Sequence, residues 1–165
     1  MGKKMRKWII TLIFTIIIIV SILSFIFINY KSDVDAINNI NVRLDGIDIF
    51  NMKITSFKLI LKVEILNPSN RTINQLSSNF DIFIENNYIG EGNFSNVNIE
   101  KNSNISKDVI ITIYYSGLAN ATIDIIKNLV NEGEFSLNIK GIVYAKALFG
   151  MSIIKQTFNA TKTYP

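Results

Sequence analysis

The stretch SFKLILKVEILN, residues Ser56 to Asn67, carries the clearest structural pattern of this chain. Every second side chain in it is apolar, and an extended strand places that apolar set on one face: Phe57, Leu59, Leu61, Val63 and Ile65. The opposite face is mostly polar, with Lys58, Lys62 and Glu64. A sustained period of two is typical of an antiparallel strand that has one buried face and one solvated face.

The residues NPSN, Asn67 to Asn70, end this strand. Pro68 has no N–H to donate to a sheet, and it pushes Asn67 toward extended geometry. The side chains of Asn67, Ser69 and Asn70 can close the exit turn through hydrogen bonds to the backbone. We therefore expect a long strand that leaves its sheet at this turn.

The same alternation recurs on both sides of this strand. It predicts strands within residues 37–50, 77–89, 94–99, 105–116, 134–147 and 151–162. A turn is expected at Asn86 and Asn87, between two alternating segments.

One segment has a different period. Over residues 119–131 the apolar residues recur at a helical spacing, Asn120 or Thr122 can cap the start, and Gly133 follows the end. About seven strands, one late helix and no βαβ alternation predict a mostly β chain, an antiparallel sandwich that carries one helix.

An apolar run, WIITLIFTIIIIVSILSFIFI, extends from Trp8 to Ile28 without a charged residue. As a helix it would rise about 32 Å at roughly 1.5 Å per residue, which matches a hydrocarbon core of about 30 Å. Trp8 and Tyr30 lie at its two ends, where amphipathic rings favour the headgroup region. We expect residues 8–28, with Ile17 near the middle, to form a transmembrane anchor.

The charges around this run predict its orientation. Basic residues precede it, and no acidic residue occurs before Asp33: the basic residues are Lys3, Lys4, Arg6 and Lys7. The positive-inside rule then places residues 1–7 in the cytoplasm as a basic tail. Residues 29–39 are expected to form a polar linker, and residues 40–165 a β-sandwich domain outside the cell membrane.

A cleaved signal peptide is the alternative interpretation of the run. Its apolar core is usually about 7–15 residues long and is followed by a small-x-small cleavage site. The run here is longer, and the residues FIFINYKSD at its end offer no such site.

Sequons at five positions agree with a domain outside the membrane. They are Asn70, Asn93, Asn104, Asn120 and Asn159.

The composition excludes several classes of function. The chain has no Cys and no His, so it lacks thiolate nucleophiles, the commonest general base and the commonest metal ligand. Four of the 17 basic residues precede the apolar run, so the other 13 balance the 13 acidic residues. A neutral domain offers no basic patch, and we expect no nucleic-acid partner.

We expect neither a cofactor nor a metal site. The pair Asp33 and Asp35 lacks the further carboxylates and the turn glycine of a calcium loop, so a solvated linker is the expected role. The candidate catalytic carboxylates occur beside Asn, Ser and Lys, as solvated charges do: Asp81, Glu85, Glu91 and Asp108. Ser106 and Lys107 are adjacent, so in a strand they point to opposite faces. We expect no enzyme.

Three segments resemble, in order and spacing, the LEA type 2 domain (late embryogenesis abundant), also called the WHy domain (water stress and hypersensitive response). They are LILKVEILNPSN, NNYIGEG and SGLANATIDIIKNLVNEGEFSLNIKG. The family pattern has a strand ending in Asn-Pro-Asn, a hairpin with Gly-x-Gly, and a helix before a strand ending in Gly. The matching residues are Asn67, Pro68, Asn70, Gly90, Gly92 and Gly141, with Ser69 inserted.

This resemblance covers about residues 37–162. It implies a fibronectin-III-like or immunoglobulin-like β-sandwich of about seven strands with one helix. It also implies no catalytic activity, a link to desiccation and stress tolerance, and, in several members, a membrane anchor.

Two functions follow from the anchor and the resemblance. The first is a binding or structural module of the cell envelope, with the bilayer and an envelope protein, a glycan or a lipid as partners. The alternative is a sandwich groove that binds lipid or another apolar ligand. The segment AKALFGMSII motivates it, because Leu148, Phe149 and Met151 surround Gly150 at an expected hairpin turn, where polar residues are usual. Packing of these side chains on the late helix or on each other would also explain them.

Overall fold

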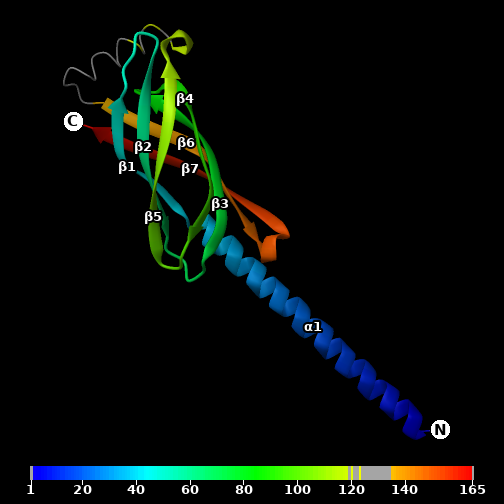
Figure 1. Ribbon diagram of the computed structural model, residues 1–165. Coiled ribbons are helices and arrows are strands. Elements are labelled where there is room, and N and C mark those ends of the chain that lie inside the picture. The colour runs from blue at the N-terminus through cyan, green and yellow to red at the C-terminus, as the bar shows by residue number, and fades with distance from the viewer. Residues whose placement is uncertain (1, 119, 121–122, 124–134, 165) are drawn as a thin grey trace.

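A computed structural model describes residues 2–118, 120, 123 and 135–164. Helix α1 (Gly2–Asn38) projects from one end of a β-sandwich (Figure 1). The described ranges contain seven strands: β1 (Asn41–Phe50), β2 (Ser56–Asn67), β3 (Ile73–Ile84), β4 (Asn87–Ile99), β5 (Ser103–Tyr114), β6 (Phe135–Ala147) and β7 (Ser152–Tyr164). Two short 3-10 turns, η1 (Tyr115–Gly117) and η2 (Leu148–Gly150), follow β5 and β6.

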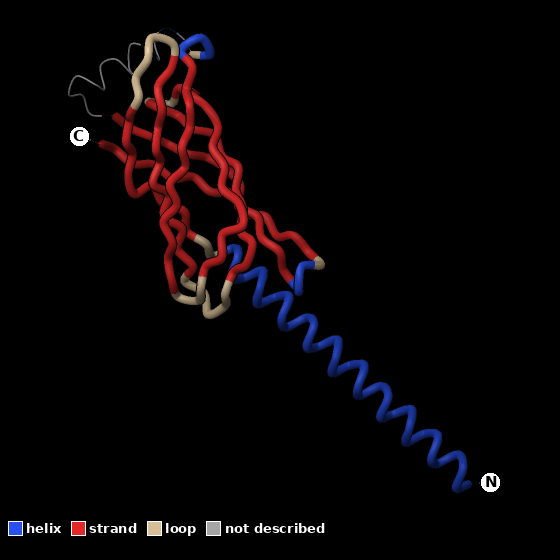
Figure 2. The backbone as a smooth tube through the Cα atoms, viewed as in Figure 1, coloured by secondary structure: helices blue, strands red, loops and turns tan. Residues whose placement is uncertain are grey.

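The strands form two antiparallel sheets, whose layers are visible in Figure 2. One sheet has the order β1-β2-β5 and the other the order β4-β3-β6-β7. The predicted mostly β, antiparallel sandwich of seven strands behind an apolar N-terminal helix is confirmed. Three strands facing four is the arrangement of fibronectin-III-like sandwiches.

The alternation in β2 supplies one side of the core. Its five apolar side chains on the predicted face, from Phe57 to Ile65, are 0% exposed. They are completely covered because β2 is the central strand of its sheet, between β1 and β5. The facing sheet supplies further fully buried side chains, among them Ile82, Ile84, Leu137 and Ile139. The period of two therefore identified the buried face correctly.

Two glycines of the family pattern make room for an aromatic ring. Phe80 of β3 pairs with Gly92 on β4 and with Gly141 on β6. A Cβ on Gly92 would lie 2.5 Å from the Phe80 ring, and a Cβ on Gly141 would lie 2.4 Å from the backbone oxygen of Asn79. The Phe80 ring also meets Phe158 edge-on, with 6.2 Å between centroids. Aromatic rings thus fill the space that the two glycines leave.

The β3–β4 hairpin differs from the prediction. Its turn lies at Glu85 and Asn86, one residue before the expected pair Asn86 and Asn87. Glu85 and Asn86 have positive φ angles of 48° and 65°, as in two-residue type I′ hairpins. The Glu85 N–H donates to the Ser136 carbonyl at 3.0 Å, which ties this turn to β6. Beyond the turn, β4 is one strand of 13 residues, where two separate pieces were expected.

Helix α1 continues past the apolar run. Residues 29–39 were expected to form a polar linker, but the helix extends through them to Asn38. Ala36 and Ile37, in its last turn, are each 2% exposed and belong to the hydrophobic core. The linker prediction was wrong for Asp33, because the helix face that carries it packs on the sandwich. Asp35 is exposed, as expected of a solvated charge.

The predicted late helix, residues 119–131, lies outside the described residues apart from 120 and 123. The strands on either side of this segment, β5 and β6, belong to different sheets. The segment therefore connects the two sheets, and its helical character stays a prediction.

Candidate functional site at the helix–sandwich junction

The apolar run of α1 is exposed around the whole helix. Trp8, Ile17 and Ile28 are 79%, 55% and 65% exposed, respectively. The hydroxyls of Thr11, Thr15 and Ser21 donate to carbonyls one turn back, so these polar groups are satisfied within the helix. The helix is long and apolar enough to cross a membrane. A core helix of a soluble protein would be buried, so α1 is a candidate membrane span or signal sequence.

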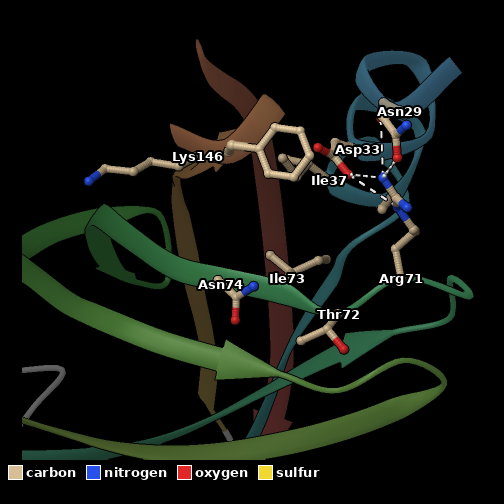
Figure 3. Close-up of a pocket in the computed structure, with 10 residues that line it drawn as sticks. Asn29, Asp33, Ile37, Arg71, Thr72, Ile73, Asn74 and Lys146 are labelled. Carbon is tan, nitrogen blue, oxygen red and sulfur yellow. Dashed lines mark hydrogen bonds and ion pairs between the residues drawn. The ribbon is translucent and has the colours of Figure 1, made fainter. Parts of the chain in front are cut away.

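Where the apolar run ends, an arginine from the sandwich binds the helix. Arg71, in the β2–β3 turn, pairs with Asp33 at 2.7 Å between Nη2 and Oδ1, and Nη2 also donates to Asn29 Oδ1 at 3.1 Å (Figure 3). The second carboxylate oxygen of Asp33 accepts the Leu148 N–H at 2.9 Å. Asp33 therefore joins the helix to two separate turns of the sandwich.

This arrangement corrects the expectation that Asp33 is a solvated linker residue. Its side chain is 25% exposed, and that of Arg71 is 37% exposed. The pair could not be predicted from a local pattern, because the two residues are 38 positions apart. One signal was available: Ala36 and Ile37 follow Asp33 at the spacings of three and four that mark a helix face.

Asn67 holds the β2–β3 turn that carries Arg71. Its side chain is fully buried, at 0% exposure. Nδ2 donates to the carbonyls of Arg71 at 2.7 Å and Glu100 at 3.0 Å, and Oδ1 accepts the Ser69 N–H at 3.1 Å. The predicted closure of the turn by Asn67 and Ser69 is confirmed, whereas the neighbouring Asn70 is exposed. Asn67 also links this turn to the β4–β5 connection, through Glu100.

We expect Asn67→Ala to lower the free energy of unfolding by about 2–3 kcal/mol, because it removes the hydrogen bonds that this buried side chain donates to the Arg71 and Glu100 carbonyls and accepts from the Ser69 N–H. Asn70→Ala, in the same turn, should change it by less than about 0.5 kcal/mol, because that side chain is exposed. Thermal unfolding of the full chain in detergent micelles measures both variants. Equal stability of the two variants would contradict this role of Asn67.

A cavity of about 290 Å³ opens between α1 and the sandwich beside this cluster (Figure 3). Its lining combines polar groups, such as Asn29 and Arg71, with apolar ones, such as Ile37 and Phe149. The cavity lies at the junction, not between the two sheets. The buried faces of the sheets are filled by their own side chains, so the cavity does not correspond to the predicted groove in the sandwich.

The turn that motivated the groove hypothesis is a hairpin turn, as expected. It connects β6 and β7 through η2. Leu148 is half-buried, whereas Phe149 is 82% and Met151 is 74% exposed. The described residues therefore do not bury Phe149 or Met151, and neither side chain lies in a groove between the sheets.

The candidate carboxylates are divided between two sheets. Asp81 on β3 and Glu91 on β4 are direct partners, and Lys140 on β6 is opposite Asp81. The Tyr88 hydroxyl donates to Glu91 at 3.3 Å. The pKa of that hydroxyl is raised, mainly by partial desolvation and to a smaller extent by the charge of Glu91. Asp108 lies on β5 in the other sheet, opposite Lys62.

These carboxylates are exposed, and Glu85 lies in the β3–β4 turn. Ser106 is exposed and Lys107 is half-buried on β5, which agrees with opposite faces for the two side chains. Within the described ranges, the acidic residues form no group of three placed to hold a metal ion.

The five sequon asparagines are all exposed.

Comparisons with known proteins bear on the fold. No protein-family model matches this chain, and no curated protein matches it. The solution structure of AT1g01470 from Arabidopsis thaliana is similar over 73% of this chain and 78% of that chain, with 15% identity and a TM-score of 0.57. At that identity the similarity shows a shared fold.

Two further solved structures are more distant. The solution structure of At2g46140.1, named as a candidate late embryogenesis abundant (LEA) protein, covers 88% of this chain and 85% of that chain, with 10% identity and a TM-score of 0.41. A β-glucuronidase from glycoside hydrolase family 2 covers 74% of this chain but 12% of that chain, with 10% identity and a TM-score of 0.43.

Proposed function

We propose that this chain is a non-catalytic module of the cell envelope, in which α1 anchors an extracytoplasmic, LEA-type-2-like β-sandwich to the membrane. The module binds or supports other envelope components and contributes to desiccation and stress tolerance. The observation that carries the proposal is the apolar run of α1, which is exposed on all sides and leads without a break into the sandwich junction.

The exposed run needs an apolar environment. Burying a large aliphatic or aromatic side chain is worth about 1.5–3 kcal/mol, and the run from Trp8 to Ile28 contains many that the sandwich leaves uncovered. A bilayer core of about 30 Å supplies that environment over the length of the run. The basic residues before the run favour a cytoplasmic N-terminus, which puts the sandwich outside.

The junction supports an anchor that remains attached to the domain. Arg71 contacts Asn29, the residue directly after the run, and Ala36 and Ile37 belong to the core of the sandwich. The contacts of Asp33 with two turns hold the sandwich in one orientation to the helix. The helix that anchors the chain thus also contributes side chains to the core of the sandwich, which would keep the domain at the membrane surface.

The link to the LEA type 2 group rests on the order of the three sequence segments and on the roles of the matched residues. Asn67 organises the turn that joins the sandwich to the helix, and Gly92 and Gly141 accommodate Phe80. These three matched residues therefore have structural roles in the sandwich, as expected for a domain without catalytic activity.

Alkaline carbonate extraction of membranes tests the anchor. This treatment strips peripheral proteins but leaves integral ones in the bilayer. The proposal predicts that the full-length chain, with residues 1–28 still present by mass, stays in the membrane pellet. A soluble chain whose N-terminus lies beyond Ile28 would contradict it and support the signal-peptide interpretation.

A further inference from the structure

The η2 turn lies level with the helix turn that follows the apolar run. The Leu148 N–H donates to Asp33, and Phe149 lines the same cavity as Asn29 and Asp33. In Figure 1 the tip of the β6–β7 hairpin lies alongside α1. The helix rises about 6 Å from Asn29 to Asp33, at roughly 1.5 Å per residue.

This height corresponds to a defined layer of a bilayer. A hydrocarbon core of about 30 Å within a total of about 40–45 Å leaves about 5–8 Å of headgroups on each side. When residues 8–28 span the hydrocarbon, residues 29–33 lie in the headgroup layer. The η2 turn, which touches the same stretch of helix, lies in that layer too.

The backbone of this turn presents apolar side chains at a conformational cost. Leu148, Phe149 and Gly150 have successive positive φ angles of 49°, 57° and 90°. Glycine or asparagine adopts such angles readily, whereas bulky residues are strained in them. Phe149 and Met151 gain little from the sandwich in return, since both are largely exposed. The hydrogen bonds of Leu148 to Asp33 and Met151 hold the turn in this shape, so its two exposed apolar side chains point outward from a defined backbone.

The charge around the turn matches a phospholipid surface. The sequence from Lys146 to Gln156 contains no acidic residue, and Lys146 and Lys155 are both exposed. The Lys146 ammonium points away from the Asp33–Arg71 pair (Figure 3). Lysine side chains at the edge of an inserted apolar tip can reach lipid phosphates while their stems stay in contact with the apolar layer.

We propose that Phe149 and Met151 insert into the headgroup–acyl boundary of the leaflet from which α1 emerges. This inference rests on the proposed anchor function of α1. The bilayer is the expected occupant, because any other partner at this height would have to displace the lipids beside the helix. With α1 and the η2 turn both in the membrane, the sandwich has two points of attachment and a fixed tilt.

Tryptophan fluorescence in vesicles tests this directly. The chain has one tryptophan, Trp8, so Trp8→Phe gives a silent background. Phe149→Trp in that background reports on the η2 turn. Ile54→Trp is the matched control: Ile54 is apolar and 98% exposed, and it lies in the β1–β2 loop at the end of the sandwich away from α1 (Figure 1).

Each full-length variant is reconstituted into vesicles of phosphatidylcholine and phosphatidylglycerol, with or without bromine on the acyl chains. We expect the Phe149→Trp variant to show a blue-shifted emission that loses most of its intensity in brominated vesicles. The Ile54→Trp variant should keep a water-exposed emission in both. The wild-type Trp8 signal, measured in parallel, reports whether α1 is inserted.

The outcomes separate the two proposals. Quenching of Trp8 but equal, weak quenching of the Phe149→Trp and Ile54→Trp variants would overturn the insertion of the η2 turn and leave the anchor in place. Absence of Trp8 quenching would overturn the anchor, and the inference with it. Quenching of the Phe149→Trp variant and not of the Ile54→Trp variant supports the inference.

Discussion

Replacing Ile17, Ile18 and Ile19 with arginine is expected to move the chain from the membrane pellet to the soluble fraction in alkaline carbonate extraction. These residues lie in the middle of the apolar run and are about half exposed on the helix surface. Exchanging an aliphatic residue for arginine at the centre of a membrane helix costs about 3–4 kcal/mol on insertion scales. Three exchanges therefore cost about 10 kcal/mol, more than the rest of the run can offset.

The control for this variant replaces the same three residues with leucine. Leucine and isoleucine have nearly equal insertion free energies, so this chain should stay in the pellet. Both variants leave the sandwich and the junction unchanged, because residues 17–19 contact neither. If the arginine variant were extracted no more readily than the leucine variant, the run would not be what holds this chain to membranes.

Gly141→Ala is expected to lower the free energy of unfolding by about 2–3 kcal/mol, the usual range for severe overpacking. The new Cβ would lie 2.4 Å from the Asn79 backbone oxygen and 2.5 Å from the Phe80 Cβ. Neither neighbour can move without shifting β3, which is a central strand paired with both β4 and β6. The measurement is thermal unfolding of the full-length chain in detergent, followed by the circular dichroism of its strands.

Gly117→Ala supplies the matched control for this substitution. A Cβ at Gly117 would meet no atom within 4 Å, and its φ is not positive. Its unfolding temperature should therefore stay close to that of the parent chain. A Gly141→Ala variant as stable as the Gly117→Ala variant would show that β3 and β6 can separate, and that Gly141 has no packing role.

The local part of the fold could be predicted because it depends on periodicity. The alternation from Phe57 to Ile65 identified both the strand and its buried face, since every second side chain of a strand points the same way. The end of β2 at Asn67 followed from the same logic, because Pro68 cannot extend a ladder. The β3–β4 turn was expected one residue too late in the chain, because Glu85 and Asn86, not Asn86 and Asn87, adopt positive φ angles.

The junction could not be predicted in the same way. It joins Asn29 and Asp33 on the helix to Arg71 and Leu148, which lie far away in the chain. No local pattern connects residues with such separations, and a polar helical turn resembles a linker in its composition. The hydrogen bond from Asn67 to Glu100 could not be predicted for the same reason, because the two residues are 33 positions apart.

The apolar turn was noticed from the sequence, but its surroundings were not. Leu148, Phe149 and Met151 contradict the usual polarity of a hairpin turn, which marked them for attention. Whether such residues are buried depends on where the hairpin ends in space. The contact of the η2 turn with α1 shows where this hairpin ends. That position favours a contact with the membrane surface over a groove between the sheets.

Protease protection in intact cells, with a tag after Pro165, tests whether α1 holds the sandwich outside the membrane. A second tag before Met1 reports the opposite end. We expect added protease to remove the C-terminal tag and to spare the N-terminal one, which stays with the membrane. Protection of the C-terminal tag in intact cells, with its loss only after lysis, would contradict an extracytoplasmic sandwich held by α1.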